Sequence, residues 1–136
     1  MGQAAHLRNY AGLHDDCEVV ALAELRPKQA QAIARVYNIP RVYSEISEML
    51  KHEKVDAIVA AQPFTRHGIL IPEIALAGVP IFSEKPIAAS YAVGEQVVKA
   101  VEANNTWHMV GYHKRSDPAT IYARDAIADL KASREI

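Results

Sequence analysis

Short runs of apolar residues alternate along this chain with segments whose apolar residues recur at helical spacing. The runs cover residues 17–23, 55–61, 79–82 and 107–111, and few polar side chains interrupt them. Such runs are typical of parallel strands that are buried on both faces. A shorter pair, Val42-Tyr43, predicts an edge strand.

The segments between these runs predict helices, and most of them begin at a start signal. Proline at the first helical position, or a serine or aspartate just before it, favours a helix start. The expected helices and their signals are 3–12, 27–37 (Pro27), 44–50 (Ser44), 65–77 (Thr65), 90–101 (Ser90) and 118–130 (Asp117-Pro118). Within the fourth helix, Pro72 predicts either a kink or a later start near Ile71.

Strands that alternate with helices at this spacing predict βαβ units, which give an α/β fold with a mainly parallel sheet and helices on both faces. The first helix is an exception, because no apolar run precedes it. The first strand of such a fold normally lies at the centre of the sheet. We therefore expect a sheet that lacks its first strand.

Composition restricts the class of protein without selecting a function. Of the 136 residues, 50% are hydrophobic and 23% are charged, as in an ordinary globular domain. A net charge of −1 gives no basic patch for nucleic acid or an anionic membrane, and no apolar run approaches the roughly 20 residues of a membrane span. Because Cys17 is alone and the histidines lack metal-ligand spacing, we expect no disulfide, no metal site and a reducing compartment.

The most specific motif is Glu84-Lys85-Pro86, which follows the third apolar run. Gly78 suits the end of the preceding helix, and Pro86 cannot donate to a strand ladder, so pairing should stop there. The motif then lies at the carboxyl end of a strand, where open α/β sheets bind their ligands. A lysine at that edge can hydrogen-bond a cofactor ribose or a substrate hydroxyl, and its charge favours a developing alkoxide.

This motif has two other interpretations. A phosphorelay receiver domain also has a Lys-Pro after a late strand, but it needs an aspartate at the end of its central strand to accept phosphate. The corresponding strand here ends in Ala60-Ala61-Gln62-Pro63, so the receiver interpretation fails. A surface ion pair at a strand end is the simpler alternative, and Glu84-Lys85 taken alone does not exclude it.

Gly2 and Glu24 have the spacing of two parts of a dinucleotide fingerprint. In that fingerprint the last glycine lets a helix pack closely on a strand, and an acidic residue about 20 positions later receives the ribose hydroxyls. The two earlier glycines of the fingerprint are not in this chain. On spacing alone, Glu24 fits a solvated strand end equally well.

Two further strand ends carry polar residues. The segment from Pro63 to His67 opens a helix whose N-terminus can face a phosphate or a ribose. His113, Lys114 and Arg115 follow the last apolar run. Each group by itself is as typical of a solvated turn as of a binding site.

Taken in order, these strand ends resemble the Gfo/Idh/MocA oxidoreductases, the group of glucose–fructose oxidoreductase and inositol dehydrogenase. The resemblance spans essentially the whole chain, and Glu-Lys-Pro after an Ala-Gly-Val lead is its most specific element. The matching segments are Met1-Gly2 with His6, Glu24, residues 55–59 with Pro63 and His67, and residues 75–79, 83–86 and 110–115 with Pro118.

The resemblance implies a Rossmann-type domain that binds NAD, with NADP as the second option. It also implies hydride transfer to or from a small sugar, polyol or related hydroxyl substrate, with Lys85 as the catalytic residue in a Lys85-Pro86 peptide that is often cis in the family. The other implied contacts are Gly2, Glu24, Pro63, His67 and Glu84 for the cofactor and His113 and Arg115 for the substrate.

Three residues modify these implied contacts. Phe64 stands where the family often has a small polar residue, which weakens the expected polar contacts there. Glu24 would repel a 2′-phosphate and so favours NAD over NADP, whereas the nearby Arg26 acts in the opposite direction.

The expected organisation is a nucleotide-binding domain over residues 1–115 and a connecting helix over residues 116–136 that leads to a larger α/β domain. In the family, that following domain supplies most of the substrate site, the proton acceptor and the oligomer interface. We therefore expect a cytoplasmic, homo-oligomeric parent enzyme, of which residues 1–136 alone are inactive. The alternative, from another class, is a non-catalytic remnant that acts at most as a weak nucleotide-binding or interaction module.

Overall fold

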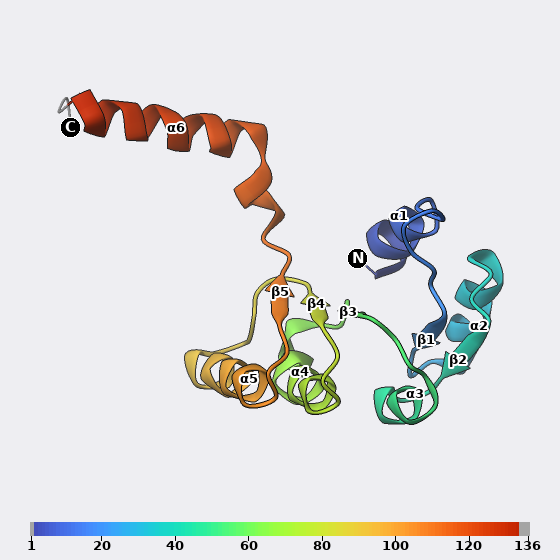
Figure 1. Cartoon of the computed structure of the whole chain (residues 1–136). Coiled ribbons are helices and arrows are strands. Elements are labelled where there is room, and N and C mark those ends of the chain that lie inside the picture. Colours follow the sequence, from blue (N-terminus) through green and yellow to red (C-terminus); the bar gives the residue numbers. More distant parts are fainter. Residues whose placement is uncertain (1, 134–136) are drawn as a thin grey trace.

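The computed structural model describes residues 2–133, which form an α/β fold (Figure 1). The strands are β1 (Ala21–Ala23), β2 (Arg41–Tyr43), β3 (Ile58–Ala60), β4 (Ile81–Ser83) and β5 (His108–Val110). The α-helices are α1 (Arg8–Tyr10), α2 (Pro27–Val36), α3 (Ile46–His52), α4 (His67–Leu76), α5 (Tyr91–Ala103) and α6 (Pro118–Ser133). A π-helix, η1 (Gly2–Leu7), and two 3-10 helices, η2 (Phe64–Arg66) and η3 (His113–Ser116), complete the described elements.

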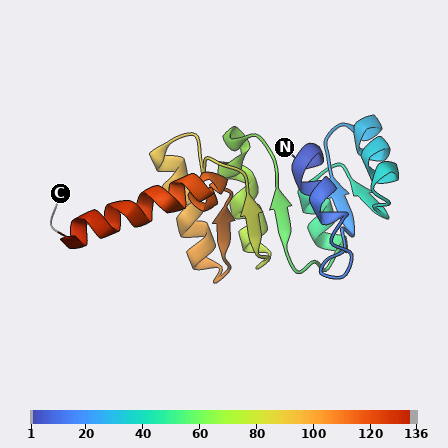
Figure 2. The same cartoon turned by 90° about the horizontal axis from the view of Figure 1, so that it is seen from above.

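The strands form two separate parallel sheets. β1 pairs with β2, and the other sheet has the order β3-β4-β5. The arrows of both sheets point the same way in Figure 2, and β1 and β3 are the edges that face each other. The predicted parallel α/β fold is confirmed, and the break between β1 and β3 is the position at which the missing central strand was expected.

The observed strands are shorter than the apolar runs that predict them. Each has three residues, whereas the first run covers residues 17–23. Ala21 to Ala23 pair with Arg41 to Tyr43, but residues 17–20 have no place in this ladder. The length of a strand therefore reflects the available partner backbone as much as the apolar run itself.

Helices cover the strands from both sides. In Figure 1, α3, α4 and α5 lie below the strands, η1 and α1 lie above them, and α6 extends away from the remaining elements. The largest buried cluster joins α3, α4 and α5 to β3 and β4 and includes Ile71, Ile74, Ile81 and Val97. Ala21 and Ala23 of β1 pack against the same cluster, so the helices join the two sheets through one core.

The first helix contacts both halves of the fold. Leu7 packs against the second buried cluster, which α2 forms with the segment before β2 and which contains Ile33, Ala34 and Ile39. The neighbouring His6 lies edge-on to Phe82 of β4, with 5.5 Å between the ring centroids. The N-terminal helix therefore spans the break between the sheets.

Several predicted helix starts are confirmed. Pro27 opens α2, and the Ser90 hydroxyl accepts a 3.4 Å hydrogen bond from the Val93 amide at the start of α5. Asp117 accepts a 3.0 Å hydrogen bond from the Ala119 amide at the start of α6. Gly78 has a positive φ of 72° directly after α4, a conformation that favours glycine at a helix end.

Two other predicted starts are wrong. Glu45 rather than Ser44 precedes α3, and its side chain makes no cap hydrogen bond. Thr65 lies within the 3-10 turn η2 instead of capping α4. A side-chain hydroxyl caps a helix only when its own residue directly precedes the first helical residue. The apolar pattern does not define where a helix begins to within one residue.

Pro72 lies inside α4, which begins at His67, so the prediction of a later start near Ile71 is wrong. A proline in a helix interior removes one backbone hydrogen bond. Ile71 and Ile74 on either side of it are at most 2% exposed, and the burial of these two side chains offsets that loss.

The α4–α5 contact depends on a glycine that the apolar pattern does not reveal. A Cβ atom at Gly68 would lie 2.5 Å from Cγ1 of Val93. We expect Gly68→Ala to lower the free energy of unfolding by about 1–3 kcal/mol through overpacking. The matched control is Gly94→Ala in α5, where the nearest atom is 3.9 Å away; it should raise stability by about 0.5–1 kcal/mol because alanine favours the helix. Urea unfolding of both variants measures the difference, and equal effects would contradict the close approach at Gly68.

Candidate functional site

The predicted site residues follow the carboxyl ends of the parallel strands. Because parallel strands end at the same edge of a sheet, this arrangement collects side chains that are far apart in the sequence. Glu24 follows β1, Pro63 follows β3, Glu84 and Lys85 follow β4, and His113 and Arg115 lie in η3 after β5. Gly2 begins η1, and only its backbone is described. The site is therefore built from turns that a common sheet edge positions.

Lys85 is an exposed side chain at the end of the middle strand of the larger sheet. Within residues 2–133, no hydrogen bond or ion pair engages its ammonium group. The Lys85-Pro86 peptide is cis, as the family resemblance implies. The Lys85 ammonium is thus free to meet a ligand at this edge.

The carboxylate of the preceding residue, Glu84, is held by the first helix. Nε2 of His6 lies 2.8 Å from Oε1 of Glu84, and both side chains are mostly buried, with 15% and 17% exposed. Burial alone would raise the pKa of the Glu84 carboxyl, but the hydrogen bond and the charge of His6 outweigh it together with smaller contributions, so the pKa lies below its ordinary value. Glu84 is therefore an anion whose partner comes from η1.

Residues 84–87 form a turn around Lys85, the Lys85 turn, and His67 holds the part of it that follows Lys85. The ring of His67 is fully buried, and its Nδ1 lies 3.1 Å from the carbonyl oxygens of both Pro86 and Ile87. Two carbonyls can only accept, so Nδ1 carries the proton and donates to both. The predicted contact between His67 and a cofactor stays a prediction, whereas the described ring faces the backbone of the Lys85 turn.

A second histidine lies beneath the same strand end. Nε2 of His108 on β5 lies 2.7 Å from Oγ of Ser83 on β4, and Ser83 is fully buried. Ser83 in turn donates to the Glu84 carbonyl at 3.3 Å. Burial is the main cause that lowers the pKa of His108, and the neighbouring His67 imidazole lowers it further.

This lowered pKa predicts a loss of stability at acidic pH. The unfolded chain takes up a proton on His108 near its ordinary pKa of about 6.5, while the folded chain takes it up only at lower pH. The free energy of unfolding should therefore fall as the pH decreases below about 6.5. Melting temperatures of the wild type and His108→Gln across this range provide the measurement, with His14→Gln, an exposed histidine, as the control. An equally steep decline in His108→Gln would contradict this assignment.

Glu24 lies on the other sheet, and Arg26 neutralises it. Nε of Arg26 lies 2.8 Å from one carboxylate oxygen of Glu24, and Nη2 lies 3.0 Å from the other. The Arg26 amide also donates to this carboxylate at 3.0 Å. These side-chain hydrogen bonds lower the pKa of Glu24. No hydrogen bond or ion pair joins Glu24 to the Lys85 turn among the described residues, and the two follow strands of different sheets.

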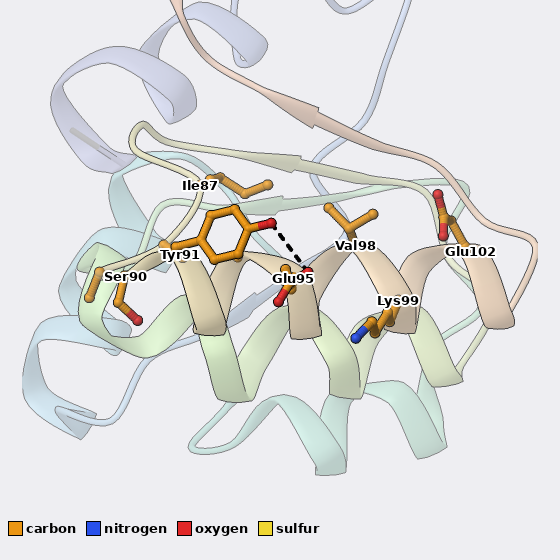
Figure 3. Close-up of a pocket in the computed structure, with 10 residues that line it drawn as sticks. Ile87, Ser90, Tyr91, Glu95, Val98, Lys99 and Glu102 are labelled. Carbon is orange, nitrogen blue, oxygen red and sulfur yellow. Dashed lines mark hydrogen bonds between the residues drawn. The ribbon is translucent and has the colours of Figure 1, made fainter.

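A groove of the described surface lies away from this turn. It runs along α5, and residues 87–90, which precede α5, form its other side (Figure 3). Tyr91 and Glu95, one turn apart on α5, share a 3.4 Å hydrogen bond in its wall. Lys85 does not line this groove, so the groove is distinct from the candidate site.

The residues that the structure describes also bear on other classes of site. They contain no group of three or more His, Cys, Asp or Glu side chains that could hold a metal ion. None of the helices formed by these residues is long and apolar enough to span a membrane.

Sequence reasoning missed three residues that support the turn: His6, Ser83 and His108. Each acts on a partner that the linear pattern does not reveal; His6 and Glu84, for example, are 78 positions apart. The available signal was the presence of His6 and Ser83 among the residues that carry the family resemblance. Partners at this separation become visible only when the strand order is known.

Comparison with known proteins gives a family match over most of the chain. Residues 1–112 match the sequence model of an oxidoreductase family with an NAD-binding Rossmann fold, GFO_IDH_MocA. An inositol 2-dehydrogenase of Rhizobium meliloti is 34% identical over 114 residues, which are 84% of this chain and 34% of that protein. The chain thus spans about a third of the length of this relative.

Solved structures agree with the observed fold. The WlbA dehydrogenase of Bordetella pertussis, solved with NADH and UDP-GlcNAcA, superposes with a TM-score of 0.89 at 28% identity, over 95% of this chain and 37% of that one. A putative myo-inositol dehydrogenase of Sinorhizobium meliloti superposes with a TM-score of 0.77 at 33% identity, over 93% and 37%. The fold is therefore shared with these two proteins.

Proposed function

This chain belongs to the Gfo/Idh/MocA family of oxidoreductases, and on that premise we propose that it is the NAD-binding domain of an enzyme that transfers a hydride between a nicotinamide cofactor and a sugar, polyol or related hydroxyl substrate. The observation that carries the proposal is the free, exposed ammonium of Lys85 on a turn whose two flanks are both hydrogen-bonded. A charge presented in this way is prepared to meet a developing alkoxide.

The described residues fit a dinucleotide along the sheet edge. Glu24 follows β1 with a carboxylate that can accept from ribose hydroxyls. Gly2 begins η1, whose His6 reaches the Lys85 turn, so the start of this helix lies between the two ends of the site. Lys85 lies at the other end. Pro63, exposed at the start of η2, contributes backbone rather than a polar side chain.

The chemistry divides between the cofactor and this chain. The nicotinamide, when bound, accepts or donates the hydride. Lys85 holds the substrate oxygen and stabilises the negative charge that develops on it. The carboxylate of Glu84, which directly precedes that lysine, is the fixed anion next to it. His113 and Arg115, both exposed in η3, bind the substrate in this proposal. The group that takes the hydroxyl proton is assigned to the following domain.

The domain organisation belongs to the same proposal. We assign residues 1–115 to the nucleotide-binding domain and residues 116–136 to a connection. No residue of α6 is buried, and its apolar Ile121, Ile127 and Leu130 are 37%, 48% and 38% exposed. Contact with a following domain would cover them. The homo-oligomer and the cytoplasmic location expected from the resemblance complete the proposal, and no observation specifically favours the alternative of a non-catalytic remnant.

The reaction is tested on the protein as its own gene expresses it, because the chain spans 34% of the relative's length. The measurement is NADH formation with a panel of inositols, aldoses and nucleotide sugars. We expect saturable, substrate-dependent reduction of NAD⁺ with at least one polyol or sugar. Binding of NAD⁺ without reduction by any member of the panel would contradict the proposed substrate class.

The preference between NAD⁺ and NADP⁺ tests whether Glu24 belongs to the proposed cofactor site. In Glu24→Gln the carboxylate that repels a 2′-phosphate is lost and Arg26 is released from its ion pair. We expect the ratio of NADP⁺ to NAD⁺ affinity to rise about tenfold, since placing like charges together costs at least 1 kcal/mol. Fluorescence titration with both cofactors measures the ratio, and Glu18→Gln, an exposed acid before β1, is the control. An unchanged ratio would remove Glu24 from the ribose site.

A further inference from the structure

The turn that presents Lys85 is held by the side chains of other residues, which bond to the neighbours of Lys85 and not to its ammonium group. The Lys85 side chain has no partner among the described residues, so the position of its ammonium depends on the backbone on either side of it. Oγ of Ser83 and the side chain of His6 hold the preceding residue, Glu84. The following two residues, Pro86 and Ile87, are held by His67.

We propose that His67 is a positioning residue for Lys85, and that it acts only through its Nδ1–H group. His67 is the first residue of α4, and its ring reaches the turn after β4 from inside the core. Its Nδ1–H group donates to the carbonyl oxygens of Pro86 and Ile87 at 3.1 Å each, so one nitrogen atom holds both peptides. This inference rests on the proposed function of Lys85, because a fixed turn matters only if that lysine meets a ligand.

The other ring nitrogen shows which part of His67 is needed. Nε2 is buried and has no hydrogen-bond partner among the described residues. A buried nitrogen without a partner adds no orientation to the ring, so the hold on the turn comes from Nδ1 alone. The neutral ring with the proton on Nδ1 is the form that satisfies both carbonyls and leaves no unpaired donor at Nε2.

This division predicts different effects for two conservative substitutions. The amide of asparagine can bring an N–H close to the position of Nδ1, whereas the longer glutamine side chain brings its amide near Nε2. We therefore expect His67→Asn to keep the turn and His67→Gln to release it. A general loss of packing would affect both variants, so the contrast separates positioning from mere structural support.

The first measurement uses the wild-type chain and no cofactor. A long-range ¹H–¹⁵N correlation spectrum of the histidine rings reports which nitrogen of His67 carries the proton. We expect the Nδ1–H form, with a proton that exchanges slowly because the ring is buried. The Nε2–H form would overturn the proposal without any variant having to fold.

The second measurement compares the two variants. In His67→Gln we expect shifted amide resonances of Lys85 and Ile87. We also expect NAD⁺ binding to weaken by up to about tenfold, the value of one net hydrogen bond, because the released turn no longer holds Lys85 against the cofactor. His67→Asn should restore the resonances and most of the affinity. Unchanged resonances in His67→Gln, or equal losses in both variants, would overturn the proposal. If the wild type bound no NAD⁺, only the proposed function would fail, because the resonances still report the position of Lys85.

Discussion

Replacing Lys85 by methionine should lower kcat for hydride transfer by about 10²- to 10³-fold, the usual contribution of a group that stabilises the charge developing on the reacting oxygen. Methionine keeps the length of the side chain and removes its charge. Because the Lys85 side chain makes no hydrogen bond or ion pair within the described chain, the fold should be unaffected. The affinity for NAD⁺ should fall at most about tenfold, the value of one net hydrogen bond.

Steady-state kinetics of NADH formation and a thermal melt check this prediction. Lys99→Met, which removes an exposed lysine of α5, is the matched control and should keep full activity. Lys85→Arg retains the charge but changes its shape and reach, so it should recover only part of the rate. A Lys85→Met enzyme with a wild-type kcat would exclude Lys85 from the chemistry.

Truncating Ile71 should have the largest effect on stability. Ile71 is 0% exposed in the cluster that joins α4 to β3, β4 and α5. We expect Ile71→Ala to lower the free energy of unfolding by about 2–5 kcal/mol through lost burial and the cavity left behind. Since domains of this size are stable by only about 5–15 kcal/mol, this loss would leave much of the variant unfolded at moderate urea concentrations.

The control lies on the same helix. Ile69 is 64% exposed, so Ile69→Ala should change the free energy of unfolding by no more than about 0.5 kcal/mol. Urea denaturation followed by circular dichroism measures both variants. Similar losses at the two positions would mean that α4 does not bury the face assigned to it.

The sequence predicted the elements of this fold well because each depends on local pattern. The apolar runs 55–61 and 79–82 contain β3 and overlap β4, and Pro27 and Ser90 open the helices expected of them. The lengths of the strands were overestimated, since they depend on where partner backbone is available. Ser44 and Thr65 were misassigned as caps because a cap depends on the exact residue at which the chain enters a helix.

The candidate site was predictable in part for the same reason. Lys85 could be located because Pro86, four residues after the apolar run 79–82, marks a strand end, and strand ends share one edge of a parallel sheet. The contacts that hold its turn could not, since His6 and His67 reach it from elements that are distant in the sequence. Spacing gave no information about Arg26 neutralising Glu24, because that depends on side-chain geometry.

The proposed function depends most directly on whether this sheet edge binds a nicotinamide dinucleotide. Calorimetric titration of NAD⁺ into the 136-residue chain, with its fold verified by circular dichroism, measures this binding. We expect a saturable heat of binding at up to millimolar NAD⁺, competition by ADP-ribose, and weaker NAD⁺ binding to Glu24→Ala. A folded chain that takes up no NAD⁺ at millimolar concentrations would contradict the proposed function.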